Sequence, residues 1–99
     1  MNERLLERLR ELPEVEEWPS QFHGEPAFWI DGREFVHTHG DEEIEVRLTG
    51  KLISRVDDER VVRRTRTSDW VVVSQSDEEL VLELAQQALE ANRRVQSST

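Results

Sequence analysis

The dipeptide Asp31-Gly32 constrains the fold of this chain more than any other feature of its sequence. It separates an apolar run, residues 27–30, from a second run of strand-forming residues, 33–39. Aspartate followed by glycine supplies the positive backbone φ angles that a two-residue hairpin turn requires. The pattern predicts an antiparallel hairpin whose facing residues are Ile30 and Arg33, Trp29 and Glu34, and Phe28 and Phe35.

A second turn signal, Gly40-Asp41, leads into residues 43–48, where apolar and polar residues alternate. Because successive residues of a strand point to opposite faces, this alternation predicts one buried face. A two-residue loop sets three further facing pairs: His39 with Glu42, His37 with Ile44, and Phe35 with Val46. The same register places Glu34 opposite Arg47 on the outer face. The buried face of this meander, from Ala27 to Leu48, then carries Phe28, Ile30, Phe35, His37, Ile44, Val46 and Leu48.

Two amphipathic segments predict helices near the ends of the chain. The first runs from Glu3 to Leu12, with Asn2 as its N-cap and Pro13 as its stop. The second begins at a capping box, Ser76 to Glu79, and continues to about Arg94. Each segment has an apolar stripe of the kind that packs on a sheet.

The remaining segments complete an expected α+β domain. Residues Val15 to Gly24 are expected to form an extended or irregular link, and Lys51 to Asp57 a short helix capped by Thr49. Apolar runs predict further strands near Val61 to Thr65 and at Trp70 to Ser74. The predicted fold is an antiparallel sheet packed against the N- and C-terminal helices.

Composition narrows the classes of function. Ninety-nine residues suit a single domain, here 1–94, followed by a polar, frayed tail, 95–99. The sequence has no cysteine, which excludes disulfides and thiolate chemistry, and no signal peptide or bilayer-spanning run, so a cytoplasmic protein is expected. The net charge of −9 opposes binding to nucleic acid or anionic membranes. No glycine-rich phosphate loop or nucleophile elbow is present, so no cofactor is expected.

His37 and His39 are the first candidates for chemistry, because alternate residues of a strand share a face. With Glu42 they offer two imidazoles and a carboxylate to a divalent metal, and His23 lies in a nearby loop. The alternative is a structural His37, hydrogen-bonded in the core, beside a turn residue, His39. The short His-x-His motif does not decide between these, and no metal is assigned.

Arg60, Arg63, Arg64 and Arg66 form a basic stripe on an otherwise acidic chain. Such a stripe suits a phosphate, a carboxylate, an acidic partner or DNA. The alternatives are neutralisation by the neighbouring acidic residues and protection of an exposed sheet edge. The net charge favours these alternatives over DNA.

The sequence also resembles a known family. The segments Gly32-Arg33-Glu34-Phe35-Val36-His37, Ile44-Glu45-Val46-Arg47-Leu48-Thr49 and Ser68-Asp69-Trp70-Val71-Val72-Val73, followed by an amphipathic helix, are similar to the small bacterial luciferase domain proteins. That resemblance implies a domain without an established activity. It marks five positions as site residues: His37, Arg47, Ser68, Asp69 and Trp70.

The order of elements also resembles the YjbR/MmcQ-type fold, which is similar to a double-wing DNA-binding architecture. Fold analogy carries little weight for function. The expected function is a non-enzymatic module that binds a small molecule or a protein, as a monomer or homodimer. The alternatives are a metal- or acid/base-dependent enzyme using His37 and His39, and DNA binding through the stripe. Trp29 is expected on the outer face, exposed or covered by a neighbouring segment.

Overall fold

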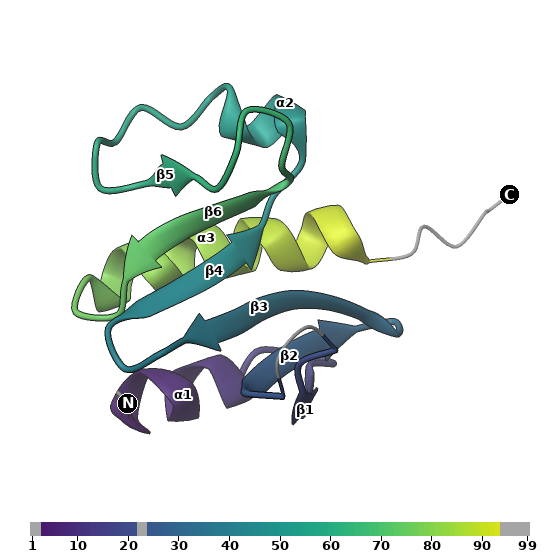
Figure 1. Ribbon diagram of the computed structural model, residues 1–99. Coiled ribbons are helices and arrows are strands. Elements are labelled where there is room, and N and C mark those ends of the chain that lie inside the picture. The colour runs from purple at the N-terminus through teal and green to yellow at the C-terminus, as the bar shows by residue number, and fades with distance from the viewer. Residues whose placement is uncertain (1–2, 22–23, 94–99) are drawn as a thin grey trace, which may run out of the picture.

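The computed structural model describes residues 3–21 and 24–93, which form one sheet with two long helices on one face (Figure 1). The elements in chain order are α1 (Glu3–Arg10), β1 (Glu16–Pro19), β2 (Pro26–Ile30), β3 (Arg33–His39), β4 (Glu43–Arg47), α2 (Gly50–Ile53), β5 (Val62–Arg63), β6 (Trp70–Ser74) and α3 (Glu78–Asn92). This arrangement confirms the expected α+β fold. Asn2, His23 and the tail 95–99 lie outside the described residues.

The six strands are antiparallel in the order β1-β2-β3-β4-β6-β5. The helix α3 packs against β3 and β4, and α1 packs against α3. Figure 1 therefore views the sheet from the side that these helices leave open. No helix in the described part of the chain is long and apolar enough to cross a membrane.

The hairpin turn between β2 and β3 forms as expected, with Asp31 at φ 52° and Gly32 at φ 79°. The pairs Ile30–Arg33 and Trp29–Glu34 are confirmed. The third expected pair is wrong, because Phe28 pairs with Val36 instead of Phe35. The register shifts at a β-bulge, in which Phe35 is the extra residue of β3.

The bulge reverses the expected orientation of His37. Phe35 and Val36 both join the hydrophobic core, so the residues on either side of them, Glu34 and His37, share the opposite face of the sheet. In an uninterrupted strand, residues three apart point to opposite faces. The expectation that His37 lies on the apolar core face is therefore wrong, and so is the expected Glu34–Arg47 pair.

The turn between β3 and β4 also differs from the expected two-residue loop. It includes Gly40, Asp41 and Glu42, so His39 pairs with Glu43 and His37 with Glu45. Gly40 takes a positive φ of 73°, which suits glycine at this position. The expected pairs of His39 with Glu42 and of His37 with Ile44 are wrong by one residue. The expected pair of Phe35 with Val46 is also wrong, because Val46 pairs with Val36.

The ends of the chain agree more closely with the sequence. The first helix buries three leucines of its stripe, and the second buries residues on one face from Val81 to Leu89. Thr49 caps α2 by accepting a hydrogen bond from the Leu52 amide. The capping box of α3 is wrong: the N-cap is Asp77, without a side-chain cap, and the Ser76 hydroxyl bonds to Ser74.

The segment expected to be an extended or irregular link contains a paired strand. β1 pairs with the outer edge of β2, within the stretch from Val15 to Gly24. All four of its residues are exposed, so it lacks the apolar alternation that marks a strand in sequence. Its structural consequence is that it positions Ser20, which follows the strand, beside the bulge.

The two faces of the sheet have different chemistry. The helix-covered face holds the apolar core, which includes the expected core residues of the meander except His37. The open face carries Glu34, His37 and Glu45, each less than 5% exposed. Trp29 lies on this face opposite Glu34, and it is half-buried, neither fully exposed nor fully covered. The fold thus places a buried ionic group outside its apolar core.

Candidate functional site

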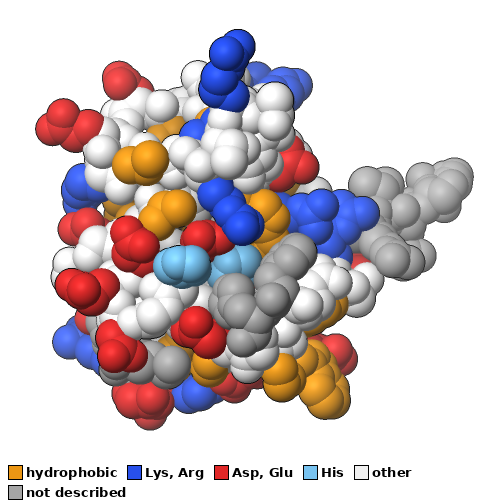
Figure 2. Space-filling view, in the orientation of Figure 1, with side chains coloured by type: hydrophobic (Ala, Val, Ile, Leu, Met, Phe, Trp, Pro, Cys, Tyr) orange, Lys and Arg blue, Asp and Glu red, His pale blue; other side chains and the backbone are white. Residues whose placement is uncertain are grey.

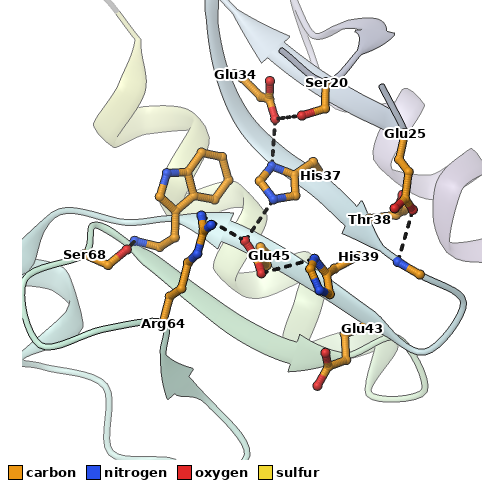
Figure 3. A network of polar contacts seen from close by, with 12 residues as sticks. Ser20, Glu25, Glu34, His37, Thr38, His39, Glu43, Glu45, Arg64 and Ser68 are labelled. Carbon is orange, nitrogen blue, oxygen red and sulfur yellow. Dashed lines mark hydrogen bonds and ion pairs between the residues drawn. The ribbon is translucent and has the colours of Figure 1, made fainter. Parts of the chain in front are cut away.

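A chain of three ionisable side chains crosses the open face of the sheet (Figure 3). The His37 Nδ1 atom lies 2.7 Å from Glu34 Oε2, and its Nε2 atom lies 2.9 Å from Glu45 Oε1. Glu34 and His37 come from the two sides of the bulge in β3, and Glu45 comes from the adjacent strand β4. We call these three residues the ionic chain.

Glu34 is the inner end of the ionic chain, and its side chain is fully buried. Its Oε2 atom accepts a hydrogen bond from the Ser20 hydroxyl at 2.7 Å, and its Oε1 atom accepts one from the backbone amide of Gln21 at 2.9 Å. With the His37 contact, this carboxylate has a donor at both oxygens. Such full hydrogen bonding is what a buried carboxylate needs to remain ionised.

His37 bonds to a carboxylate at each of its ring nitrogens. An ionised carboxylate only accepts hydrogen bonds, whereas a neutral imidazole has one donor and one acceptor nitrogen. Two such contacts are satisfied together when both ring nitrogens carry protons. The contacts of Glu34 and Glu45 therefore favour an imidazolium at His37, which neutralises one of the two buried negative charges.

Trp70 covers one side of the imidazole ring. The two ring centroids are 4.5 Å apart with an angle of 36° between the planes, and Trp70 is 7% exposed. On the indole, the Arg47 guanidinium lies 6.0 Å from the ring centroid, within the range of a cation–π contact. The Ser68 hydroxyl accepts a hydrogen bond from the Trp70 backbone amide.

The outer end of the ionic chain is Glu45, whose side chain is 5% exposed. The Arg64 Nη1 atom lies 3.5 Å from Glu45 Oε1, and the His39 Nδ1 atom lies 3.6 Å from Oε2. These two basic side chains are about half exposed. Glu45 therefore connects the buried charges with groups that solvent reaches.

Glu45, His39 and Arg64 line a hollow of about 850 Å³ on the open face of the sheet. Its remaining lining residues come from the β3–β4 turn, β4, the α2–β5 segment, β5 and β6: Gly40, Asp41, Glu42, Glu43, Arg60, Val62, Val72, Val73 and Ser74. Figure 2 shows histidine side chains near the middle of this face, with acidic and basic side chains beside them. The hollow has both charged groups and apolar valine side chains.

The comparison with protein families decides which group of proteins the chain is part of. The luciferase domain model matches residues 32–88, more than half of the sequence. The chain belongs to the luciferase domain family. The matched segment includes the whole ionic chain and Trp70, whereas Ser20 and Gln21 precede it. No curated protein and no solved structure matches the chain.

The site residues implied by the resemblance are partly brought together in this luciferase domain. Trp70 contacts His37 with its ring and also lies next to the Arg47 guanidinium. The Ser68 hydroxyl accepts a hydrogen bond from the backbone amide of Trp70. The Asp69 side chain is exposed, and its backbone carbonyl accepts a hydrogen bond from Leu48. His37 belongs to the ionic chain, and the other three of these residues lie beside it. Asp69 contributes only its backbone, in a contact where β4 ends and β6 begins.

The metal hypothesis for His37, His39 and Glu42 gains no support from the geometry. His37 uses both ring nitrogens for carboxylates, so neither faces an open coordination position. Glu42 lies in the turn, and the strand partner of His39 is Glu43. Within residues 3–21 and 24–93, no group of three histidine or acidic side chains is arranged to hold a metal ion.

The basic stripe is largely neutralised within the luciferase domain. Arg60 donates two side-chain hydrogen bonds to Asp58, at 3.0 and 2.7 Å, and Arg63 donates one to the Ser68 carbonyl. The side-chain and backbone hydrogen bonds from Arg60 lower the pKa of Asp58 to about 2. Arg66 is exposed. Because Arg64 lies against Glu45, the stripe has internal partners along much of its length.

Sequence reasoning missed three participants: Ser20, Glu34 and Glu45. The sequence places Glu34 on the outer face and Ser20 in an extended or irregular link, and neither position marks a candidate. The available signal was the presence of two glutamates in strands that are otherwise apolar. Their meeting with His37 depends on the bulge at Phe35, for which the local sequence carries no marker.

Proposed function

We propose that this luciferase domain is a binding module for a small organic molecule, which occupies the hollow on the open face of the sheet. The observation that carries the proposal is the ionic chain, whose outer end, Glu45, lines the hollow. Its inner end is fully buried and held by Ser20 and Gln21. Fixed charge at the wall of a hollow is what a selective binding site requires.

The energetic cost of the ionic chain supports a functional role. Burying charged side chains is expensive, and an apolar cluster of similar size commonly gives equal or greater stability. This chain keeps two carboxylates and an imidazole on a face that its helices do not cover. Their contacts hold Glu45 in one orientation, so a ligand would meet a preorganised carboxylate.

The outer residues provide the ligand contacts. Arg64 has five guanidinium donors, and its contact with Glu45 uses one of them at 3.5 Å. His39 adds a half-exposed ring, and Val72 adds apolar surface from β6. The module thus offers an acceptor, donors and an apolar surface to one molecule.

The proposal is tested by amide NMR spectra recorded with a fragment panel containing acidic, basic and neutral members. At least one fragment is expected to shift the amides of residues 43–45, 62–64 and 72 with saturation. The variant Glu45→Gln is expected to weaken or abolish these shifts, while Arg33→Ala, at the exposed start of β3, leaves them unchanged. Shifts confined to other surfaces, or no saturating shifts, would overturn the proposal.

A second candidate function is acid/base catalysis at His39. The observation that favours it is the position of the His39 ring, whose Nδ1 atom lies 3.6 Å from the held carboxylate of Glu45. A carboxylate beside one imidazole nitrogen orients the ring for proton transfer at the other. The test is hydrolysis of p-nitrophenyl acetate: a rate that falls to background in His39→Ala supports catalysis, and equal rates count against it.

A further inference from the structure

We propose that the ligand of the hollow is an organic cation, an alkylammonium group on a short apolar body. This inference rests on the proposed function, because it assigns a ligand class to the same hollow. It follows from the charge of the lining, from one carboxylate oxygen of Glu45 and from the apolar surface beside it.

The charge of the lining favours a cation. The described lining residues include four carboxylates, Asp41, Glu42, Glu43 and Glu45, and two guanidiniums, Arg60 and Arg64, giving a formal charge of −2 with His39 neutral. Arg60 is bound by Asp58 and lies 3.5 Å from Asp77, which adds further negative charge nearby. Behind the wall, the charges of Glu34 and an imidazolium at His37 cancel. The protein as a whole carries −9, which attracts cations and repels anions.

The Oε2 atom of Glu45 is the acceptor for the ammonium group. Oε1 is engaged by His37 at 2.9 Å and approached by Arg64 at 3.5 Å. Oε2 meets the Nδ1 atom of His39 at 3.6 Å, which is too long for a hydrogen bond. A side chain that is 5% exposed therefore presents one carboxylate oxygen to the hollow with capacity for a charge-assisted hydrogen bond.

The apolar part of the ligand has a surface to lie on. Val62 of β5 and Val72 of β6 are strand partners, so both side chains are on the open face. Val62 is 58% exposed, which is high for a branched aliphatic residue. Both valines line the hollow together with Glu45. A chain of a few methylene groups attached to the ammonium would cover this surface.

Arg64 is the observation that favours an anion instead, since guanidinium groups bind carboxylates. Its position against Glu45 reduces that tendency, because an incoming carboxylate would meet the Glu45 charge as well. In the cationic assignment, Arg64 remains paired with Oε1 and the ammonium binds Oε2. Three probes of similar length separate these possibilities.

The experiment measures binding of n-butylammonium, butyrate and 1-butanol by amide NMR at constant pH and ionic strength. Butylammonium is expected to shift residues 43–45, 62–64 and 72 with saturation, and butyrate and butanol to bind at least about tenfold more weakly. Tighter binding of butyrate or butanol at these residues would overturn the cationic assignment and leave the hollow as the binding site. Failure of all three probes at these residues, with failure of the fragment panel, would remove both proposals.

Variants assign the contact to Glu45. Glu45→Gln is expected to weaken butylammonium binding about tenfold or more, because it removes the charge from the acceptor. Because Glu45 also bonds to His37, a second variant is needed that leaves the ionic chain intact. The double substitution Glu42→Gln with Glu43→Gln removes two exposed carboxylates that line the hollow, and it should weaken binding severalfold. Glu90→Gln, on the exposed side of α3, removes one negative charge, as each of the other substitutions does, and should leave affinity unchanged. Equal affinity of all variants would contradict the assignment.

Discussion

Glu34 is a buried carboxylate of the open face whose two oxygens both have hydrogen-bond partners. It is fully buried, and it accepts hydrogen bonds from Ser20 and Gln21 and contacts His37. Loss of one member of a buried ionic group costs far more than loss of an exposed charge, because the remaining partners stay buried without compensation. Replacing a single residue of the ionic chain is therefore expected to lower the free energy of unfolding by more than replacing an exposed charged residue does.

Glu34→Gln keeps the shape of the side chain and removes its charge. It is expected to lower the free energy of unfolding by about 1–3 kcal/mol. The reason is that the glutamine side chain has one acceptor oxygen, whereas the donors of the parent chain bond to two carboxylate oxygens. Urea denaturation measures the change. Glu59→Gln, an exposed glutamate of the α2–β5 segment, is the matched control and should stay within about 0.5 kcal/mol of the parent chain. Equal effects of the two substitutions would contradict the account of Glu34.

Asp58 gives a prediction for pH. Hydrogen bonds from Arg60 lower its pKa from 3.8 to about 2, so the folded protein holds this carboxylate ionised at lower pH than the unfolded chain does. The resulting stabilisation is complete above the unfolded value and is lost as the pH falls through about 2. A carboxyl ¹³C NMR titration should place the Asp58 midpoint near 2 in the parent chain and nearer 3.8 in Arg60→Ala. A midpoint unaffected by the substitution would remove Arg60 as the cause.

At the scale of secondary-structure elements, the β2–β3 hairpin determines the site. Its turn sets the pairing of Ile30 with Arg33, and the bulge at Phe35 then brings Glu34 and His37 to one face. The turn depends on a positive φ at two consecutive residues, Asp31 and Gly32. Alanine in that left-handed conformation is strained by contacts of its Cβ atom with the backbone.

Gly32→Ala and Gly50→Ala form a matched pair that tests this dependence. Gly32 has a φ of 79° with open space around the position of a Cβ atom, so its substitution should cost about 1–2 kcal/mol through backbone strain alone. Gly50 begins α2, and an added Cβ atom would lie 3.7 Å from Arg63 Nη2, an ordinary contact. Its substitution should leave stability unchanged or slightly higher. Thermal unfolding measures both; a larger loss at Gly50 would contradict the turn assignment.

The elements also show how far sequence reasoning reaches. The N- and C-terminal helices, the Asp31-Gly32 turn and the strand at β6 follow from patterns within a few residues, and these are confirmed. The short helix expected from Lys51 to Asp57 begins one residue earlier and ends at Ile53. The bulge and β1 do not follow, because the bulge depends on tertiary packing of both Phe35 and Val36, and β1 has no buried residue. His37 was identified as a candidate, but its two partners depended on the bulge and on the three-residue turn before β4.

At the scale of the whole molecule, stability is expected to decrease from the centre of the sheet to its edges. β3 and β4 are paired on both sides and covered by α3, whereas β1 is exposed and β5 contributes two paired residues at the opposite edge. Segments with few buried contacts open with lower free energy than the core. The hollow borders β5, so this edge is also where the fold can adjust to a ligand.

Native-state hydrogen exchange tests this gradient. The amides of β3 and β4 are expected to exchange slowest, near the rate of global unfolding, and the amides of β5 fastest among the strands. A saturating concentration of a ligand that binds the hollow should slow exchange in β5 more than in β1, because β1 lies at the far edge of the sheet. Equal protection of β5 and β4 in the ligand-free protein would contradict the gradient.

The ionic chain is the central claim, and the most direct measurement is the ¹⁵N spectrum of the histidine rings at neutral pH. Because Glu34 and Glu45 each accept from one ring nitrogen, both nitrogens of His37 are expected to carry protons, with ring N–H signals that exchange slowly. Glu34→Gln should shift the Nδ1 signal most. A His37 ring with one unprotonated nitrogen in the parent chain, unaffected by Glu34→Gln, would contradict the account.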